Sequence, residues 1–196
     1  MTDADPLRVE YTTVTELIDF ITYAIESISL GFDRWGEEYV RGPGLFFVVV
    51  TGVHSREYAD PLGENTWPVE TCRVMTENLD GFVEAAREVG HSRDGAIIIS
   101  TDGTIQEQMV RIKSLDNNRT GTEDGTIEYA DWMGTKHLSA VEVSVREEIV
   151  AAVTLSEENG RMTIFMDGSY DDFQRDALGG EWRVIDDENP VPCSNR

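Results

Sequence analysis

Lysine is nearly absent from this chain of 196 residues. Lys113 and Lys136 are the only lysines, and arginine makes up the rest of the 16 basic residues. The 38 acidic residues leave a formal net charge of -22. So few positive charges exclude a protein that binds nucleic acid through a broad basic face, and they disfavour docking on anionic membranes.

Long hydrophobic runs and closely spaced cysteines are also missing. No stretch reaches the roughly 18 apolar residues of a membrane-spanning helix, so we expect no membrane partner. The first residues show no basic region followed by an apolar one, so we expect no secretory signal. Cys72 and Cys193 lie far apart, and we expect both thiols to stay free in a reducing cytoplasm. The chain is therefore expected to be cytoplasmic.

A high content of acidic residues together with very little lysine is typical of a protein that works in concentrated salt. At 1 M salt the Debye length is about 3 Å, so carboxylates scarcely repel one another while they keep the surface hydrated. The composition favours a halophilic protein over the alternative, an ordinary acidic one. The length and the 40% content of hydrophobic residues indicate a single globular domain.

The pattern of hydrophobic residues predicts an α/β domain with a mixed central β-sheet flanked by helices. Thr13 and Glu16 form a capping box for a first helix that ends at Gly31. The continuous apolar run 45–50 predicts a strand buried on both faces. The further elements expected are a loop over 51–68, a helix over 69–90, a strand over 96–100, a turn over 101–104 with an antiparallel return over 105–112, a loop over 116–126, a helix over 139–148, and strands over 150–155 and 162–165.

The segment Asp94-Gly95-Ala96 lies between an expected helix and a buried strand. On its spacing alone it is a tight turn, since Asp and Gly are common turn residues. In the functional interpretation, Gly95 lets a ligand approach the backbone and Asp94 presents a carboxylate to a metal ion. Hard cations that accompany nucleotide phosphates usually take one or two such carboxylates.

A second segment, Gly134 to Ser139, opens an expected helix after a polar loop. The free amides and the positive dipole end of a helix N-terminus suit an anion. The hydroxyls of Thr135 and Ser139, together with Lys136 and His137, add further donors. The alternative is an ordinary capped helix start with a solvated lysine, and the spacing leaves both interpretations open.

The third segment, Ser156-Glu157-Glu158, ends an expected strand and by itself indicates a solvated acidic turn. No Cys/His spacing suggests structural zinc. The sequence contains no dinucleotide-binding, Walker A or nucleophile-elbow motif.

Taken together, the three segments resemble the diadenylate cyclase domain family. This family is the nucleotide-binding domain of the DNA integrity scanning protein and of the membrane-anchored bacterial cyclases. Its members carry a D-G-A turn that enters a strand, a later G-T-R-H-R segment, and an S-E-E segment at a strand end. This chain has the three in the same order and at similar spacing, within roughly residues 40–166.

The resemblance implies an enzyme that joins two ATP molecules into cyclic di-AMP and releases two pyrophosphates. Each 3′-hydroxyl attacks the α-phosphorus of the facing ATP, so two subunits must meet in a homodimer or a higher homo-oligomer. A manganese or magnesium ion is the expected cofactor. The implied organisation is an N-terminal helical segment over 1–40, a nucleotide-binding domain over 41–168, and an acidic tail over 169–196 that packs on the same domain through Trp182 and Ile185.

The resemblance also assigns roles by position. Asp94 contacts the metal and the attacking hydroxyl, and Glu158 is the second metal ligand. Lys136 and His137 act in catalysis beside Asp94. Ile112 packs on the adenine. The full set of implied substrate-binding residues is Gly95, Ala96, Ile112, Gly134, Thr135, Ser139, Ser156 and Glu157.

One departure concerns the R-H-R part of the motif, which is Lys136-His137-Leu138 in this chain. Lysine keeps a charge without the bidentate geometry of arginine, and Leu138 loses the second cation. A second interpretation therefore stays open: a nucleotide- or cyclic di-AMP-binding module that does no chemistry. A third is an unrelated acidic α/β protein that acts through partner contacts. The presence of Asp94 favours the enzyme over the binding module. Because the family's transmembrane bundle and helical spine with a DNA-binding end are both missing, we expect a soluble, stand-alone cyclase.

Overall fold

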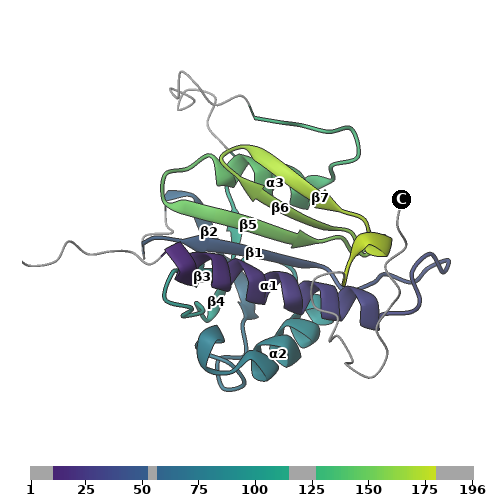
Figure 1. Cartoon of the computed structure of the whole chain (residues 1–196), viewed down its shortest axis with the longest axis horizontal. Coiled ribbons are helices and arrows are strands. Elements are labelled where there is room, and N and C mark those ends of the chain that lie inside the picture. The colour runs from purple at the N-terminus through teal and green to yellow at the C-terminus, as the bar shows by residue number, and fades with distance from the viewer. Residues whose placement is uncertain (1–10, 53–56, 115–126, 180–196) are drawn as a thin grey trace, which may run out of the picture.

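Five strands form the central mixed sheet of the computed structural model, which describes residues 11–52, 57–114 and 127–179. Their order across the sheet is β3–β1–β5–β6–β7 (Figure 1). β1 pairs with β3 in parallel, and the other neighbours are antiparallel. The strands are β1 (Leu45–Val50), β3 (Ile97–Ser100), β5 (Ile149–Leu155), β6 (Met162–Met166) and β7 (Ser169–Phe173).

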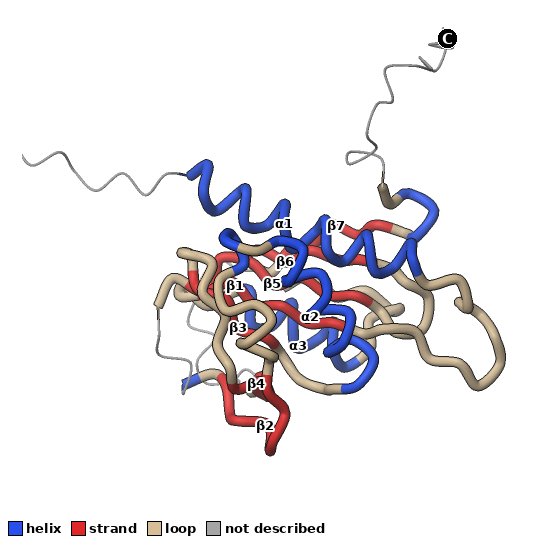
Figure 2. Tube along the Cα trace, turned by 90° about the horizontal axis from the view of Figure 1, so that it is seen from below, coloured by secondary structure: helices blue, strands red, loops and turns tan. Residues whose placement is uncertain are grey.

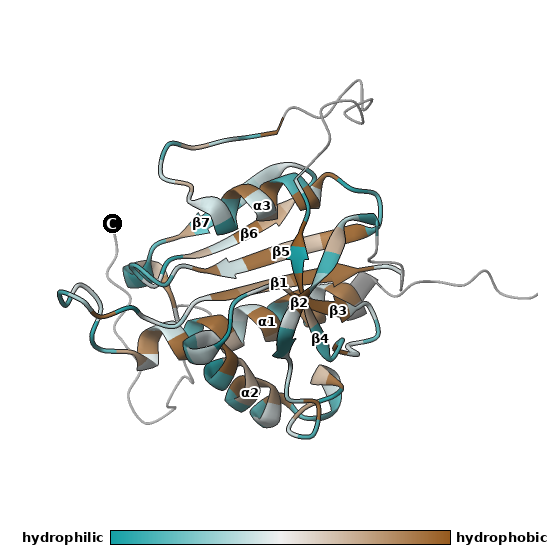
Figure 3. Ribbon diagram, turned by 180° about the vertical axis from the view of Figure 1, so that it is seen from behind, coloured by the Kyte–Doolittle hydropathy of each residue, from teal (hydrophilic) through white to brown (hydrophobic). Residues whose placement is uncertain are grey.

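Helices cover both faces of this sheet, which confirms the predicted fold class. α1 (Tyr11–Gly31) and α2 (Leu79–Ser92) pack on one face, and α3 (Thr135–Ser144) packs on the other. All six residues of β1 are buried as a consequence. Phe47 belongs to the cluster on the α1 and α2 side, whereas Phe46 and Val48 belong to the cluster on the α3 side. Figure 3 shows how hydrophobic residues concentrate in the central strands.

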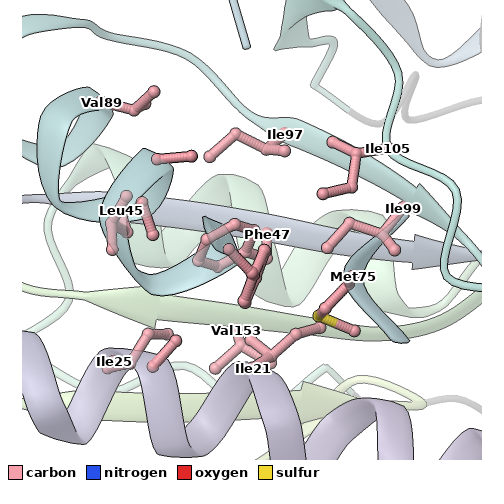
Figure 4. Packing of buried hydrophobic residues seen from close by; sticks show 14 of the residues in the cluster. Ile21, Ile25, Leu45, Phe47, Met75, Val89, Ile97, Ile99, Ile105 and Val153 are labelled. Carbon is pink, nitrogen blue, oxygen red and sulfur yellow. The ribbon is translucent and has the colours of Figure 1, made fainter. Parts of the chain in front are cut away.

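The N-terminal helix shares its core with the sheet. Ile21 and Ile25 of α1 are fully buried in the same cluster as Phe47 and Val153 (Figure 4). Full burial of an aliphatic or aromatic side chain of this size contributes roughly 1.5–3 kcal/mol to folding. The described part of the N-terminal segment is therefore an integral layer of the domain.

The structure corrects the prediction of a loop over 51–68. β2 (Ala59–Thr66) lies inside that range and pairs antiparallel with β4 (Gln108–Ile112) in a separate two-stranded sheet. This small sheet extends from the main body, at the bottom of Figure 2. Pro61 and Gly63 disfavour a strand in the sequence, and both are tolerated because β2 is an edge strand with a mostly exposed face.

The return after the 101–104 turn is only partly as predicted. The chain does turn at Gly103, whose amide donates to the carbonyl of Ser100, and Ile105 forms an isolated antiparallel bridge with Ile99. From Gln108 onward, however, β4 pairs with β2 along its length and keeps only the Ala96–Val110 bridge toward β3.

Several element boundaries also differ from the sequence prediction. α1 ends at Gly31 as expected but begins at Tyr11, so Thr13 lies inside the helix and the predicted capping box is wrong. α2 begins only at Leu79, where the side chain of Asn78 accepts a hydrogen bond from the Gly81 amide. The first half of the predicted 69–90 helix is instead a turn and one short 3₁₀ helix, η2 (Met75–Glu77).

Near the C-terminus, α3 covers 135–144 instead of 139–148. β7 and a 3₁₀ turn, η3 (Arg175–Ala177), form within the segment predicted as a tail. The predicted 116–126 loop and the anchors Trp182 and Ile185 lie outside the described residues. Within the described ranges, no helix combines the length and the apolar character needed to cross a bilayer.

Candidate functional site

A cavity of about 830 Å³ opens on the α3 side of the sheet. Its volume is in the range of small-molecule sites. Strand β4, the N-terminus of α3 and the turn between β5 and β6 form its walls. Every candidate residue from the sequence lines it: Asp94, Gly95, Ala96, Ile112, Gly134, Thr135, Lys136, His137, Ser139, Ser156, Glu157 and Glu158.

The Asp94-Gly95-Ala96 turn is fixed by its neighbours from the small sheet. Gly95 has φ +118°, and a Cβ added there would lie 2.8 Å from Leu62 Cδ2 and 3.1 Å from the Val110 carbonyl oxygen. A side chain at this position is therefore excluded both by backbone conformation and by space. The carbonyl of Asp94 accepts a hydrogen bond of 2.8 Å from Asn65 Nδ2. These contacts hold the backbone, while the carboxylate of Asp94 remains at the cavity wall.

The N-terminus of α3 lies at the cavity and has no capping side chain. Gly134 is its N-cap, no side chain caps the helix, and the first turn holds no acidic residue. The first backbone amides of a helix have no partner within it, and together with the helix dipole they attract anions. Thr135 and Ser139, which also line the cavity, add hydroxyl groups at this end. No capping side chain occupies these amides, so the segment is not the ordinary capped helix start of the alternative interpretation.

Lys136 reaches across the cavity toward the other two segments. Its Nζ lies so close to the backbone of Gly44 that a Cβ at residue 44 would be only 2.7 Å away. Burial lowers the pKa of Lys136, while the nearby carboxylates of Glu157 and Asp94 raise it. The ammonium group therefore lies within the electrostatic field of both carboxylates, and those charges favour its protonated form.

His137 is 7% exposed, and its Nε2 has no hydrogen-bond partner among the described residues. Its ring lies 5.1 Å from the Trp132 ring and 6.3 Å from the Phe165 ring, measured between centroids. Burial and the positive charges of Lys136 and Arg161 lower its pKa, so the imidazole is neutral at pH 7. A buried polar nitrogen without a partner costs about 1–3 kcal/mol. A ligand in the cavity is a natural partner for this nitrogen.

The Ser156-Glu157-Glu158 turn is anchored from both sides. The amide of Ser156 donates to the Arg161 carbonyl at 2.9 Å across the β5–β6 hairpin. The carbonyl of Glu157 accepts from the Gly42 amide at 2.9 Å, and its Oε1 lies 3.5 Å from Arg41 Nη1. The turn therefore places a hydroxyl and two carboxylates at the cavity on a fixed backbone, which a freely solvated acidic turn would not do.

Sequence reasoning missed several residues of the cavity wall. These are Phe46, Leu62, Val110, Arg111, Trp132, Met133, Asn159 and Arg161. The position of Arg161 directly after the Asn159-Gly160 turn was a usable signal, because that turn brings it opposite Ser156. Leu62 and Trp132 gave no such signal in the sequence, because only the packing of β2 and of the segment before α3 brings them to the site.

The residues present fit a divalent cation that arrives with phosphates. Within the described ranges, no group of three or more His, Cys, Asp or Glu side chains can hold a metal ion. Asp94 and Glu158 nevertheless line one cavity with Glu157. Magnesium is commonly bound by one or two carboxylates together with substrate phosphates, and this donor set matches that arrangement.

Comparison with known proteins finds a similarity to solved structures in fold alone. No protein-family model matches the chain, and no curated protein matches its sequence. A structure of a hypothetical membrane spanning protein from Bacillus cereus superposes with a TM-score of 0.55 at 17% identity, over 81% of this chain. This chain spans 64% of the length of that one. DacA from Staphylococcus aureus, solved as a double mutant, gives a TM-score of 0.44 at 18% identity over 83% of this chain and 89% of the other.

Proposed function

We propose that this chain is a diadenylate cyclase, which converts two ATP molecules into cyclic di-AMP and two pyrophosphates. The observation that carries the proposal is the meeting of three segments, distant in the sequence, around one cavity. This cavity combines the open N-terminus of α3, a lysine, a buried imidazole without a partner, and three carboxylates. Such a set of groups suits a nucleotide triphosphate and the charge that develops during its reaction.

The reaction consists of two equivalent displacements. The 3′-oxygen of one ATP forms a bond to the α-phosphorus of the other, and the bond from that phosphorus to the bridging oxygen breaks. Pyrophosphate leaves with the electron pair. The proton of the hydroxyl passes to a carboxylate oxygen of Asp94. The second displacement closes the ring in the same way. Because each chain holds one ATP, two copies face each other, in a homodimer or a larger homo-oligomer.

The residues of the chain act mainly by positioning and by neutralising charge. Thr135, Lys136, Ser139 and Ser156 bind the phosphates, with the amides that follow Gly134. Neutral His137 donates from Nε2 to a phosphate oxygen in one tautomer. Gly95 and Ala96 let the nucleotide approach the backbone. The adenine packs against Ile112, which lines the cavity.

A manganese or magnesium ion, held by Asp94 and Glu158 and by the phosphates, would supply positive charge against the phosphate oxygens. Glu157 lies in the field of Lys136 and steadies its ammonium group at the cavity.

A binding module without catalysis is the second candidate function, and one observation favours it. Leu138, which occupies the place of the second arginine in the motif, is 37% exposed and is not part of the cavity wall. A site that had lost this cation without replacement would hold ATP or cyclic di-AMP with little turnover.

The two functions are separated by comparing the protein with its Asp94→Ala variant. Each is incubated with ATP and manganese or magnesium in molar potassium chloride, because the acidic composition favours a halophilic protein, and cyclic di-AMP is detected by mass spectrometry. We expect product from the wild-type protein and none from Asp94→Ala. Exposed Asp33→Ala, outside the cavity wall, is the matched control and should keep full activity. Bound ATP without any product would establish the binding module.

A further inference from the structure

Arg161 lines the cavity. It is a cation outside the Lys136-His137-Leu138 segment, in which Leu138 supplies none. It follows the turn at Gly160, and its carbonyl accepts the hydrogen bond from the Ser156 amide. Residues that lie directly opposite each other in an antiparallel hairpin point to the same face. Arg161 and Ser156 accordingly both line the cavity, on the α3 side of the sheet.

The guanidinium of Arg161 is held in one orientation by three neighbours. Its central carbon lies 4.2 Å from the centroid of the Trp132 ring, and its Nε lies 3.6 Å from Asp172 Oδ1. With its amide oxygen turned toward the guanidinium, Gln174 also accepts from Nε, at 3.3 Å. The side chain is only 14% exposed. A guanidinium stacked on an aromatic ring and paired along one edge is fixed in space, and this pre-organisation favours planar recognition of an oxyanion.

The donors of Arg161 are not all used by these contacts. A guanidinium carries five N–H groups. Nε faces Asp172 and Gln174, and Nη2 also donates to the Gln174 amide oxygen, at 2.5 Å. Among the described residues, the structure gives Nη1 no hydrogen-bond partner. The charge of Arg161 also reaches the interior of the site, since it acts with Lys136 to lower the pKa of the buried His137. Two cations from different elements thus act on one imidazole.

We propose that Arg161 is a phosphate-binding residue of this cavity and supplies the second cation that Leu138 does not. The assignment rests on the proposed function in one respect, namely that the cavity takes ATP. It does not require turnover, because binding of the triphosphate is enough. Asp172 and Trp132 then serve as positioning residues that hold the guanidinium at the wall, while Lys136 approaches the same ligand from α3.

Binding of ATP and of adenosine to the full chain, measured by titration calorimetry in molar potassium chloride, tests this assignment. Arg161→Met keeps an unbranched side chain and removes the charge. A charged hydrogen bond contributes about 1.5–3 kcal/mol, which corresponds to a roughly 10- to 150-fold change in Kd. We expect Arg161→Met to weaken ATP binding by about that factor and adenosine binding less than about threefold. Arg161→Lys, which keeps the charge without the fork, should fall between wild type and Arg161→Met.

Arg34→Met is the matched control, since Arg34 is paired with Glu37 on the surface and does not line the cavity. It should bind ATP as the wild-type protein does. Unchanged ATP affinity in Arg161→Met, or an equal loss for ATP and adenosine, would overturn the assignment and leave Arg161 as a purely structural ion pair. If Arg161→Met does not fold, as judged by circular dichroism, the same comparison is decided by Arg161→Lys. A wild-type protein that binds no ATP would overturn the proposed function itself, which is a different result.

Discussion

The Nζ atom of Lys136 lies against the backbone of Gly44, where a side chain would leave it no room. A Cβ at residue 44 would be 2.7 Å from Nζ and 3.2 Å from Glu157 Cβ. Gly44 precedes the first residue of β1, and its amide donates to the Gly90 carbonyl at 2.8 Å. The strand therefore begins at a glycine that makes space for the cation of the site.

The first prediction concerns Gly44→Ala. The added methyl displaces Lys136, so we expect ATP affinity and turnover to fall by about tenfold or more, because small misplacements at a reacting centre are costly. The free energy of unfolding should change little, since the displaced atom is the end of a flexible side chain. Gly52→Ala is the control, because a Cβ there meets no atom within 4 Å. Normal ATP binding by Gly44→Ala would show that Lys136 does not need its observed position.

A second prediction separates two reasons for the glycine at position 95. Gly95 has φ +118° and also lacks space for a Cβ, whereas Gly63 has φ +56° and open space around it. A residue with a side chain at positive φ costs roughly 1–3 kcal/mol, so both alanine variants should be destabilised. Gly95→Ala should lose more stability than Gly63→Ala, and it should also lose ATP binding. Denaturant titration in molar salt measures both variants, and equal losses would mean that the contacts with Leu62 and Val110 are unimportant.

A third prediction follows from the buried imidazole of His137. Its pKa in the folded protein lies below the ordinary value of 6.5, because of burial first and of Lys136 and Arg161 next, against the opposite effect of Asp172 and Glu158. The unfolded chain therefore takes up this proton first as the pH falls. The contribution to stability is complete above about pH 6.5 and is lost as the pH falls through the lower folded pKa.

Urea titrations between pH 8 and pH 5 measure this effect, above the range in which most carboxylates titrate. His137→Asn should lose less stability over this interval than the wild-type protein does. Identical slopes for the wild-type protein and His137→Asn would contradict a neutral, buried His137.

A fourth prediction concerns the metal ion. Because the described residues hold no preformed cluster for a cation, manganese alone should leave the melting temperature nearly unchanged. Manganese with ATP should raise it, since a ligand at 100 times its Kd stabilises the folded state by about 2.7 kcal/mol. Chelation of the metal should abolish turnover without unfolding the protein. A large stabilisation by manganese alone would indicate a site held by the protein itself.

The sequence indicated the segments that line the candidate cavity, whereas it missed the small sheet. Asp94, Lys136 and Ser156 were recognisable because each lies in a short motif at the end of an element, and the packing of those elements brings all three to one cavity. β2 was missed because an exposed edge strand needs no hydrophobic alternation, and its partner β4 follows more than 40 residues later. No local pattern contains that pairing.

Arg161 and Trp132 show a different limit. The Asn159-Gly160 turn indicates that Arg161 lies opposite Ser156, but no local pattern indicates its contact of 4.2 Å with Trp132, which joins the β5–β6 turn to the segment before α3. The resemblance of Lys136-His137-Leu138 to R-H-R drew attention to Leu138 instead, although Leu138 does not line the cavity. That Arg161 lines the same cavity as Lys136 is visible only once the tertiary structure is known.

The most direct test of the central claim is the mass balance of ATP with the wild-type protein. ATP, pyrophosphate and cyclic di-AMP are quantified together, with manganese or magnesium in molar potassium chloride, over a range of protein concentrations. The account predicts one cyclic di-AMP and two pyrophosphates for every two ATP consumed, with a specific activity that rises with protein concentration as copies pair. ATP that binds and is recovered intact at every concentration would contradict it.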